Sequence, residues 1–185
     1  MSNQSDHFFV KVFFALWPTA AERSRLAAWQ TPLKKLCGGR AMQAEKLHAT
    51  LVFIGNVEPS RLEALHLAAQ EVSGEGFELR FDEARYWGHN HIVYAAPVHV
   101  PQQLTQLVGA LEEKLARHRF KPDQREYKPH VTLMRNAHWS DVPLPAMPPV
   151  SWQAKEFALV QSTHQEYRVL ARFPLQPSGL QPIGG

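Results

Sequence analysis

The sequence predicts an α+β fold built from two related lobes, and three observations support this prediction. Segments typical of strands and helices follow one another in the order β-α-β-α-β-β-β-α-β-β-β, without the strict alternation of a doubly wound sheet. The pattern H-x-T-L occurs twice, at His48–Leu51 and His130–Leu133, each time in an expected strand that follows a helix. The chain has 185 residues, of which 44% are hydrophobic and 20% are charged, as in one globular domain. We therefore expect residues 1–185 to form a single domain.

The first three elements are expected to be a strand, a helix and a strand. Residues 8–17 are almost all apolar and rich in residues that favour strands, and a proline ends the run. A threonine then caps a helix over residues 20–36, which ends at the glycine pair after Cys37. A connector leads to a strand over residues 48–54, which ends at a Gly-Asn pair.

The middle of the chain is expected to begin and end with a helix. The helix over residues 61–72 follows a Pro-Ser pair and has apolar residues at helical spacing. Apolar and charged residues alternate over residues 77–81, as in a half-buried strand. Strands over residues 85–88 and 91–98 join at a turn, and a proline starts a helix over residues 102–119.

The last third of the chain is expected to be mostly strand. A proline precedes the strand over residues 130–135, and four further prolines make residues 139–150 a surface connection. Strands over residues 153–162 and 166–173 join as a hairpin. Residues 174–185 are expected to form a loose tail.

The composition excludes several kinds of site and surface. The single cysteine, Cys37, excludes an internal disulfide, a zinc ribbon and an iron–sulfur centre, and it favours a reducing compartment such as the cytoplasm. A net charge of +3 favours an anionic ligand without requiring one. No apolar run reaches the roughly 18 residues of a membrane span, so we expect no membrane partner.

The duplicated motif gathers the residues that point to chemistry. Side chains alternate along a strand, so His48 and Thr50 share one face, and His130 and Thr132 share another. Two imidazoles with pKa values near ~6.5 can act as base and acid at neutral pH. Neither motif contains a serine or cysteine nucleophile or a third metal ligand. These groups fit the cleavage of a phosphodiester, and polar residues satisfied locally in two ordinary strands are the alternative.

The two H-x-T-L motifs, the N-terminal strand FFALWP and the block PHVTLMR resemble the 2H phosphoesterase superfamily. Within it, the sequence is most similar to the bacterial RNA 2′,3′-cyclic phosphodiesterase group, the LigT-like or 2′-5′ RNA ligase family. The resemblance covers about residues 8–173. It implies two pseudo-symmetric lobes of mainly antiparallel sheet, with helices outside and an active-site cleft between them.

The resemblance also implies an activity and the roles of four residues. Members open 2′,3′-cyclic phosphates to 2′-phosphates without a metal or a cofactor, and some join tRNA halves through a 2′-5′ linkage. Carried over to this sequence, His48 is the proton donor to the departing 3′ oxygen, and His130 is the proton acceptor that activates water. Thr50 and Thr132 bind the phosphate.

Three further residues are candidates for substrate binding. Arg135 lies where family members often have a basic residue near the phosphate, but a straight strand turns it away from His130, so it needs a bend. Phe13 or its neighbour Phe14 can stack on a base, with an ordinary core role as the alternative. Tyr167 is expected at the rim of the cleft.

Two further groups of polar residues have open interpretations. His89 and His91 form an H-x-H pattern that suits a metal, although a turn between strands is the favoured interpretation. Lys121, Arg125 and Lys128 precede the second motif and either steer an RNA backbone or lie in a solvated loop.

The expected function is therefore hydrolysis of RNA 2′,3′-cyclic phosphate ends, with tRNA-like RNA among the possible substrates. A first alternative is a related phosphodiesterase that acts on a small cyclic nucleotide phosphate or a 2′-5′ oligonucleotide. A second is an RNA-binding module without catalysis, against which the intact histidine pair argues. We expect a monomer with no obligate protein partner.

Overall fold

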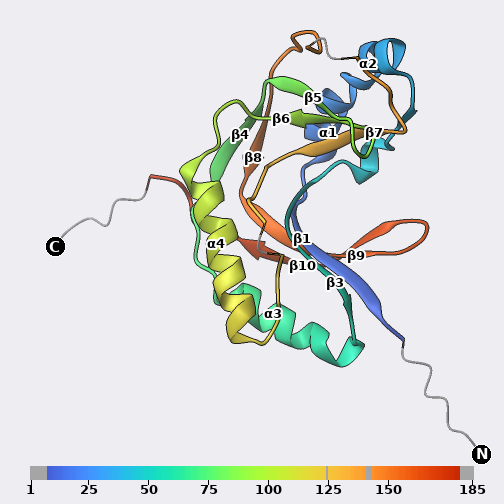
Figure 1. Ribbon diagram of the computed structural model, residues 1–185. Helices are drawn as coiled ribbons and strands as arrows, with labels where there is room; N and C mark the ends of the chain where they lie inside the picture. The colour runs from blue at the N-terminus through green and yellow to red at the C-terminus, as the bar shows by residue number, and fades with distance from the viewer. Residues whose placement is uncertain (1–7, 124, 141–142, 180–185) are drawn as a thin grey trace, which may run out of the picture.

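The computed structural model describes residues 8–123, 125–140 and 143–179, and their strands form three sheets (Figure 1). The first sheet has the order β10-β9-β1-β3, the second has the order β2-β7-β6-β5, and β4 and β8 form a two-stranded ribbon. The strands are β1 (Val10–Leu16), β2 (Arg40–Ala41), β3 (Ala49–Val57), β4 (Phe77–Phe81), β5 (Glu83–Trp87), β6 (Ile92–Ala96), β7 (Val131–Arg135), β8 (Val150–Ala154), β9 (Glu156–Ser162) and β10 (Tyr167–Pro174). All pairings within the three sheets are antiparallel, which confirms the predicted α+β class.

Two helix pairs flank the two four-stranded sheets. The helices are α1 (Ala20–Ala27), α2 (Gln30–Cys37), α3 (Leu62–Gln70) and α4 (Gln102–Arg117). Figure 1 shows α3 and α4 together near the first sheet, where they contact β10 and β3 respectively. The helices α1 and α2 lie at the other end, where α1 contacts β8 and α2 contacts β2 and β7. Each four-stranded sheet therefore has its own helical cover.

Apolar residues from both halves form one large buried core. Fully buried side chains such as Leu26, Leu65, Leu111 and Leu133 belong to this single cluster, which joins the helices to both sheets. Two smaller clusters lie apart from it: one is centred on Phe13 in the first sheet, and the other contains Ile92, Tyr94 and Ala96 in the second. Burial of this size stabilises a domain without disulfides or metals.

The predicted helix over residues 20–36 is wrong in one respect, because it is two helices. The chain breaks at Ala28 and Trp29, where the Trp29 amide donates to Leu26 in a tight turn at 3.0 Å. Pro32 explains the break, since it has no N–H for the carbonyl of Ala28 and its ring crowds that carbonyl. The Trp29 indole is buried and donates to Pro148 O at 2.9 Å, which fixes the corner.

The predicted strand over residues 153–162 is also two elements. The chain changes direction at Lys155, so that β8 pairs with β4 and β9 pairs with β1 and β10. The strand β8 begins at Val150, inside the expected proline-rich connection, and β2 lies in the expected connector before the first motif. Short strands such as these depend on distant partners and leave a weak local pattern.

The end of the chain stays packed for longer than expected. Pro174 still belongs to β10, Leu175 is buried and donates its amide to Lys155 O at 2.8 Å, and Gln176 bridges Glu75. The expectation of a loose tail is therefore wrong for residues 174–176, and residues 180–185 lie outside the described residues. No helix in the described part of the chain has the length and apolar character needed to cross a lipid bilayer.

Candidate active site

His48 lies just before β3 and is held by hydrogen bonds on both ring nitrogens. Its Nδ1 lies 2.7 Å from the carbonyl oxygen of Lys46. A carbonyl can only accept, so Nδ1 carries the hydrogen and the neutral ring presents the lone pair of Nε2. That nitrogen lies 3.1 Å from Thr50 Oγ1, which confirms that the two side chains share a face of the strand.

His130 lies just before β7 and repeats this arrangement. Its Nδ1 donates to the carbonyl oxygen of Lys128 at 2.8 Å, again two residues earlier in the chain. The same tautomer follows, and Nε2 is the nitrogen left for chemistry. The two histidines, 82 residues apart, are therefore oriented by the same local contact.

Each motif contains a β-bulge at its last residue, the leucine. In β3, Phe14 pairs with Val52 and the next residue pairs with Thr50, which leaves Leu51 without a partner in the ladder. In β7, Val93 pairs with Met134 and the next residue pairs with Thr132, which leaves Leu133 extra in the same way. A bulge shifts the alternation of side chains by one position. In each strand two consecutive side chains are consequently buried after the threonine.

The bulge supplies the bend that Arg135 needs. Both Leu133 and Met134 are buried, so the next residue, Arg135, turns back to the side of His130 and lines the same cavity. The bulge of β3 turns Phe53 toward the cavity in the same way. Phe53 is the fifth residue after His48, and Arg135 is the fifth residue after His130.

Two side chains and one backbone amide from other parts of the chain donate hydrogen bonds to carbonyls at or beside the bulges. The Tyr127 hydroxyl donates to Thr50 O at 3.0 Å, which ties the segment before the second motif to the first motif. On the other side, Gln30 of α2 donates its Nε2 to Leu133 O at 2.9 Å, and the Met42 amide donates to the same oxygen at 2.8 Å. Backbone that the ladders leave free is thus satisfied.

Both motifs open into one cavity of about 270 Å³. All seven residues predicted from the sequence line it: Phe13, His48, Thr50, His130, Thr132, Arg135 and Tyr167. The cavity also includes Lys11, Met42, Lys46, Phe53 and Ser162, which the sequence reasoning missed. Three of the twelve lining residues are cationic and none is a carboxylate, so the cavity suits an anion.

Aromatic rings enclose His48. Its ring stacks against Phe13 at a centroid distance of 5.0 Å and against Trp17 at 5.6 Å, and Tyr167 meets it edge-on at 5.2 Å. Burial, with a smaller contribution from the positive charges of His130, Arg23 and Arg135, lowers the pKa of His48 to about 4. His48 is therefore neutral at pH 7 in the empty cleft.

Of the two interpretations of Phe13, the core role fits its burial in the structure. Only 4% of the residue is exposed, because it packs on His48 and against the edge of Tyr167. The open ring of the cavity is Phe53, which is opposite Phe13 in the ladder and is 48% exposed. Phe13 therefore positions His48, and Phe53 is the ring accessible to a ligand.

His130 has fewer rings around it. Trp87 meets it edge-on at a centroid distance of 4.7 Å, and Tyr94 does so at 5.7 Å. Burial lowers the pKa of His130, with a smaller effect from the positive charge of Arg135. The two imidazoles are alike in orientation but unlike in surroundings.

The residues with open interpretations lie outside this cavity. His91 has a φ of 56° in the turn after β5 and accepts or donates a 3.0 Å hydrogen bond with the Tyr86 hydroxyl. Among the described residues, no cluster of three or more potential ligands could hold a metal ion. Arg125 pairs with Asp123 in the loop before the second motif, and Lys128 lines an adjoining cavity.

The missed residues left two usable signals in the sequence. Lysine precedes each motif at the same spacing, so that the repeat is K-x-H-x-T-L at Lys46 and Lys128. The residue five positions after each histidine enters the cavity, which would have identified Phe53 from the position of Arg135. Lys11 and Ser162 left no such signal, because only strand pairing brings them to the cavity.

Comparison with known proteins matches this chain to one family over most of its length. The model of the 2′-5′ RNA ligase superfamily matches residues 17–166. The RNA 2′,3′-cyclic phosphodiesterase of Escherichia coli is 32% identical over 127 residues, which cover 69% of this chain and 72% of that protein. The Thermus thermophilus protein of the same name is 26% identical over 188 residues, covering 90% of this chain and 91% of its own.

Solved structures agree with this match. The crystal structure of E. coli LigT complexed with 3′-AMP superimposes with a TM-score of 0.81 at 30% identity. The superposition covers 91% of this chain and 99% of that chain. The arrangement of sheets around the cavity is thus shared with a protein that binds a nucleotide.

Proposed function

The chain belongs to the 2′-5′ RNA ligase superfamily, and on that basis we propose that it hydrolyses the 2′,3′-cyclic phosphate ends of RNA to 2′-phosphates. It is a hydrolase, an RNA 2′,3′-cyclic phosphodiesterase, as its relatives are named. One observation carries the proposal: two imidazoles in the same tautomer present Nε2 to one cationic cavity, with Thr50 and Thr132 among its lining residues.

The reaction uses one histidine for each of two proton transfers. His130 takes a proton from water through Nε2, and the water oxygen forms a bond to phosphorus. The bond from phosphorus to the 3′ oxygen breaks, and His48 gives that oxygen a proton through its own Nε2. Thr50, Thr132 and the cation of Arg135 stabilise the charge on the non-bridging oxygens.

This division of roles requires His48 to gain a proton when substrate binds. Its pKa of about 4 leaves it neutral in the empty cleft. An anionic phosphate nearby favours the charged form of an imidazole and raises its pKa. The negative charge of the bound substrate therefore raises the pKa of His48, so that His48 is protonated and can act as the acid.

The assay combines an oligonucleotide that ends in a 2′,3′-cyclic phosphate with excess EDTA and separates the products that end in a 2′-phosphate from those that end in a 3′-phosphate. We expect turnover that EDTA leaves unchanged, because histidines move both protons, and a 2′-phosphate product. A 3′-phosphate product would reverse the assigned geometry. Loss of activity in EDTA, restored by added metal, would contradict the two-histidine mechanism.

The proposal also covers the domain organisation, the oligomeric state and the cellular location of the protein. The two lobes act as one domain because a single buried core joins both sheets. The chain acts as a monomer without an obligate protein partner, and the lone cysteine fits a location in the reducing cytoplasm. Tight RNA binding without turnover would instead favour a binding module.

A further inference from the structure

A second cavity adjoins the active site along the first sheet. It measures about 590 Å³ and shares Lys11 and Ser162 with the catalytic cavity. Its other walls include Phe8, Phe9 and His164. We call it the outer cavity.

Strand pairing shows where the outer cavity lies: from the two histidines, the chain of β1 passes first Phe13 and then the outer cavity. Lys11 pairs with Ser162 on β9, and Phe13 pairs with Val160, so Lys11 lies one step further along the same face of the sheet. Phe9 comes another two residues earlier in the chain. A ligand that leaves the catalytic cavity in this direction passes Lys11 and then reaches the two phenylalanines.

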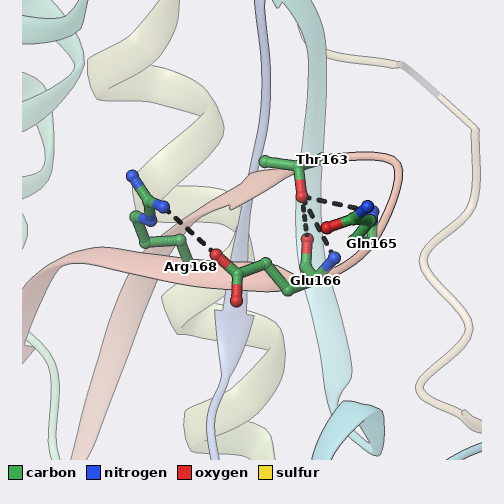
Figure 2. A network of polar contacts seen from close by, with 4 residues as sticks. All are labelled: Thr163, Gln165, Glu166 and Arg168. Atoms are coloured by element: carbon green, nitrogen blue, oxygen red, sulfur yellow. Dashed lines mark hydrogen bonds and ion pairs between the residues drawn. The ribbon is translucent and has the colours of Figure 1, made fainter.

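The hairpin loop that forms one wall is held in place by its own side chains. Thr163 Oγ1 donates to Glu166 O at 2.9 Å and accepts from the amides of Glu166 and Gln165 at 3.0 and 3.4 Å (Figure 2). Arg168 binds the Glu166 carboxylate at 3.1 Å. A wall that is ordered in advance loses little conformational entropy when a ligand binds.

Charge distinguishes the outer cavity from the other groove that adjoins the active site. That groove shares Thr50, Phe53 and His130 with the catalytic cavity. Its described lining carries three carboxylates against two cations: Glu112, Asp123, Glu126, Arg125 and Lys128. The described lining of the outer cavity contains the cation of Lys11 and no carboxylate. A polyanion is therefore favoured in the outer cavity.

We propose that the outer cavity binds the nucleotide that precedes the cyclic-phosphate end of an RNA strand. The inference rests on the proposed function, in which the cyclic phosphate is the 3′ end and the strand continues only from its 5′ side. Lys11, at the boundary of the two cavities, contacts the phosphodiester between the two nucleotides. Phe8 and Phe9, which are 70% and 50% exposed, offer rings on which the base stacks. The substrate class is thus an oligonucleotide.

The test compares two substrates on two proteins. The substrates are a dinucleotide with a 2′,3′-cyclic phosphate and the corresponding nucleoside 2′,3′-cyclic phosphate, and the variant is Phe8→Ala/Phe9→Ala. We expect the unaltered protein to prefer the dinucleotide in kcat/KM by about tenfold or more, the scale of one base stacked on a ring. The double variant loses this preference and hydrolyses the mononucleotide as before.

One control variant and one further test variant accompany this comparison. Leu67→Ala, an exposed apolar residue on α3, should leave both rates unchanged. Lys11→Gln should weaken the salt dependence of kcat/KM for the dinucleotide, because one phosphate contact is lost.

Three results would overturn the inference. One is equal use of both substrates by the unaltered protein, and another is a double variant that keeps its preference for the dinucleotide. A third is an equal loss on both substrates, which would assign the rings to the catalytic cavity. Hydrolysis of neither substrate would overturn the proposed function and this inference together.

Discussion

The strands that follow His48 and His130 are alike in their own geometry. Both histidines donate Nδ1 to the carbonyl two residues earlier, and both strands bulge at the leucine after the threonine. The residue five positions after each histidine enters the cavity. Two segments that share the pattern K-x-H-x-T-L therefore have the same local geometry in two different sheets.

The surroundings of the two strands are unlike. Three aromatic rings enclose His48, and burial lowers its pKa to about 4. His130 meets two rings edge-on, and the fifth residue after it is Arg135, where the first motif has Phe53. Burial lowers the pKa of both imidazoles, and the positive charges that add to this effect are His130, Arg23 and Arg135 around His48 but Arg135 alone around His130. The repeat sets where the nitrogens point, and the neighbours give the two imidazoles different surroundings.

The largest expected effect comes from removing either imidazole. His48→Ala and His130→Ala should each lower kcat by at least ~10²-fold, the usual contribution of a positioned acid or base. Their unfolding midpoints should change little, because both side chains line a cavity rather than the core. His99→Ala, in an exposed loop, serves as the control.

A sulfur leaving group separates the two roles. A thiolate leaves without a proton far more readily than an alkoxide does. A substrate with sulfur at the 3′ position should therefore restore turnover to His48→Ala and not to His130→Ala. Restoration of the His130 variant alone would exchange the assigned acid and base.

The lowered pKa of His48 should appear in the pH dependence of stability. His48 has a folded-state pKa of about 4, below the value near 6.5 of the unfolded chain, so its contribution is full above pH 6.5 and is lost as pH falls toward 4. The free energy of unfolding should fall by about 2 kcal/mol from pH 7 to pH 5 through this group alone. Urea titrations of the wild type and His48→Gln at both values measure it. An equal fall in both proteins would show that the pKa of His48 is not lowered.

Replacing either threonine should weaken transition-state binding by nearly the same amount, because the two motifs have the same local geometry. Thr50→Ala and Thr132→Ala should each reduce transition-state binding by roughly one to two kcal/mol, as for one hydrogen bond to a charged oxygen. The measurement is kcat/KM for each variant, with Thr105→Ala on the exposed face of α4 as a control. A cost confined to one threonine would mean that the phosphate is held by one lobe.

The smallest expected effect concerns the bond that links the lobes. Tyr127→Phe removes the hydrogen bond to Thr50 O and should lower the free energy of unfolding by about 1 kcal/mol. Because the ring stays, the cavity should keep its shape and kcat should change less than twofold. A large loss of kcat with unchanged stability would give Tyr127 a direct part in the reaction.

Local patterns predicted most elements and the two histidine–threonine pairs, the family resemblance added Arg135, and the failures have physical causes. The helical spacing of apolar residues continues past Pro32, so this pattern does not show that the chain forms two helices there. The run over residues 153–162 contains no glycine or proline, so nothing local shows that Gln153 and Ala154 belong to one sheet and residues 156–162 to another. The choice between a core role and base stacking for Phe13 likewise needed the fold, since only the fold reveals that the ring of Phe13 packs on His48.

By itself, the sequence determined the two histidine–threonine pairs, because alternation along a strand is a local property of the backbone. It also determined the α+β class and, through the motifs, the family. Only the tertiary structure decided which residues complete the site. Tyr127 reaches Thr50 from 77 residues away and Gln30 reaches Leu133 from 103 residues away, and no local pattern encodes such distances. The lowered pKa values of the two imidazoles have the same origin, because desolvation depends on what the whole fold packs around each ring.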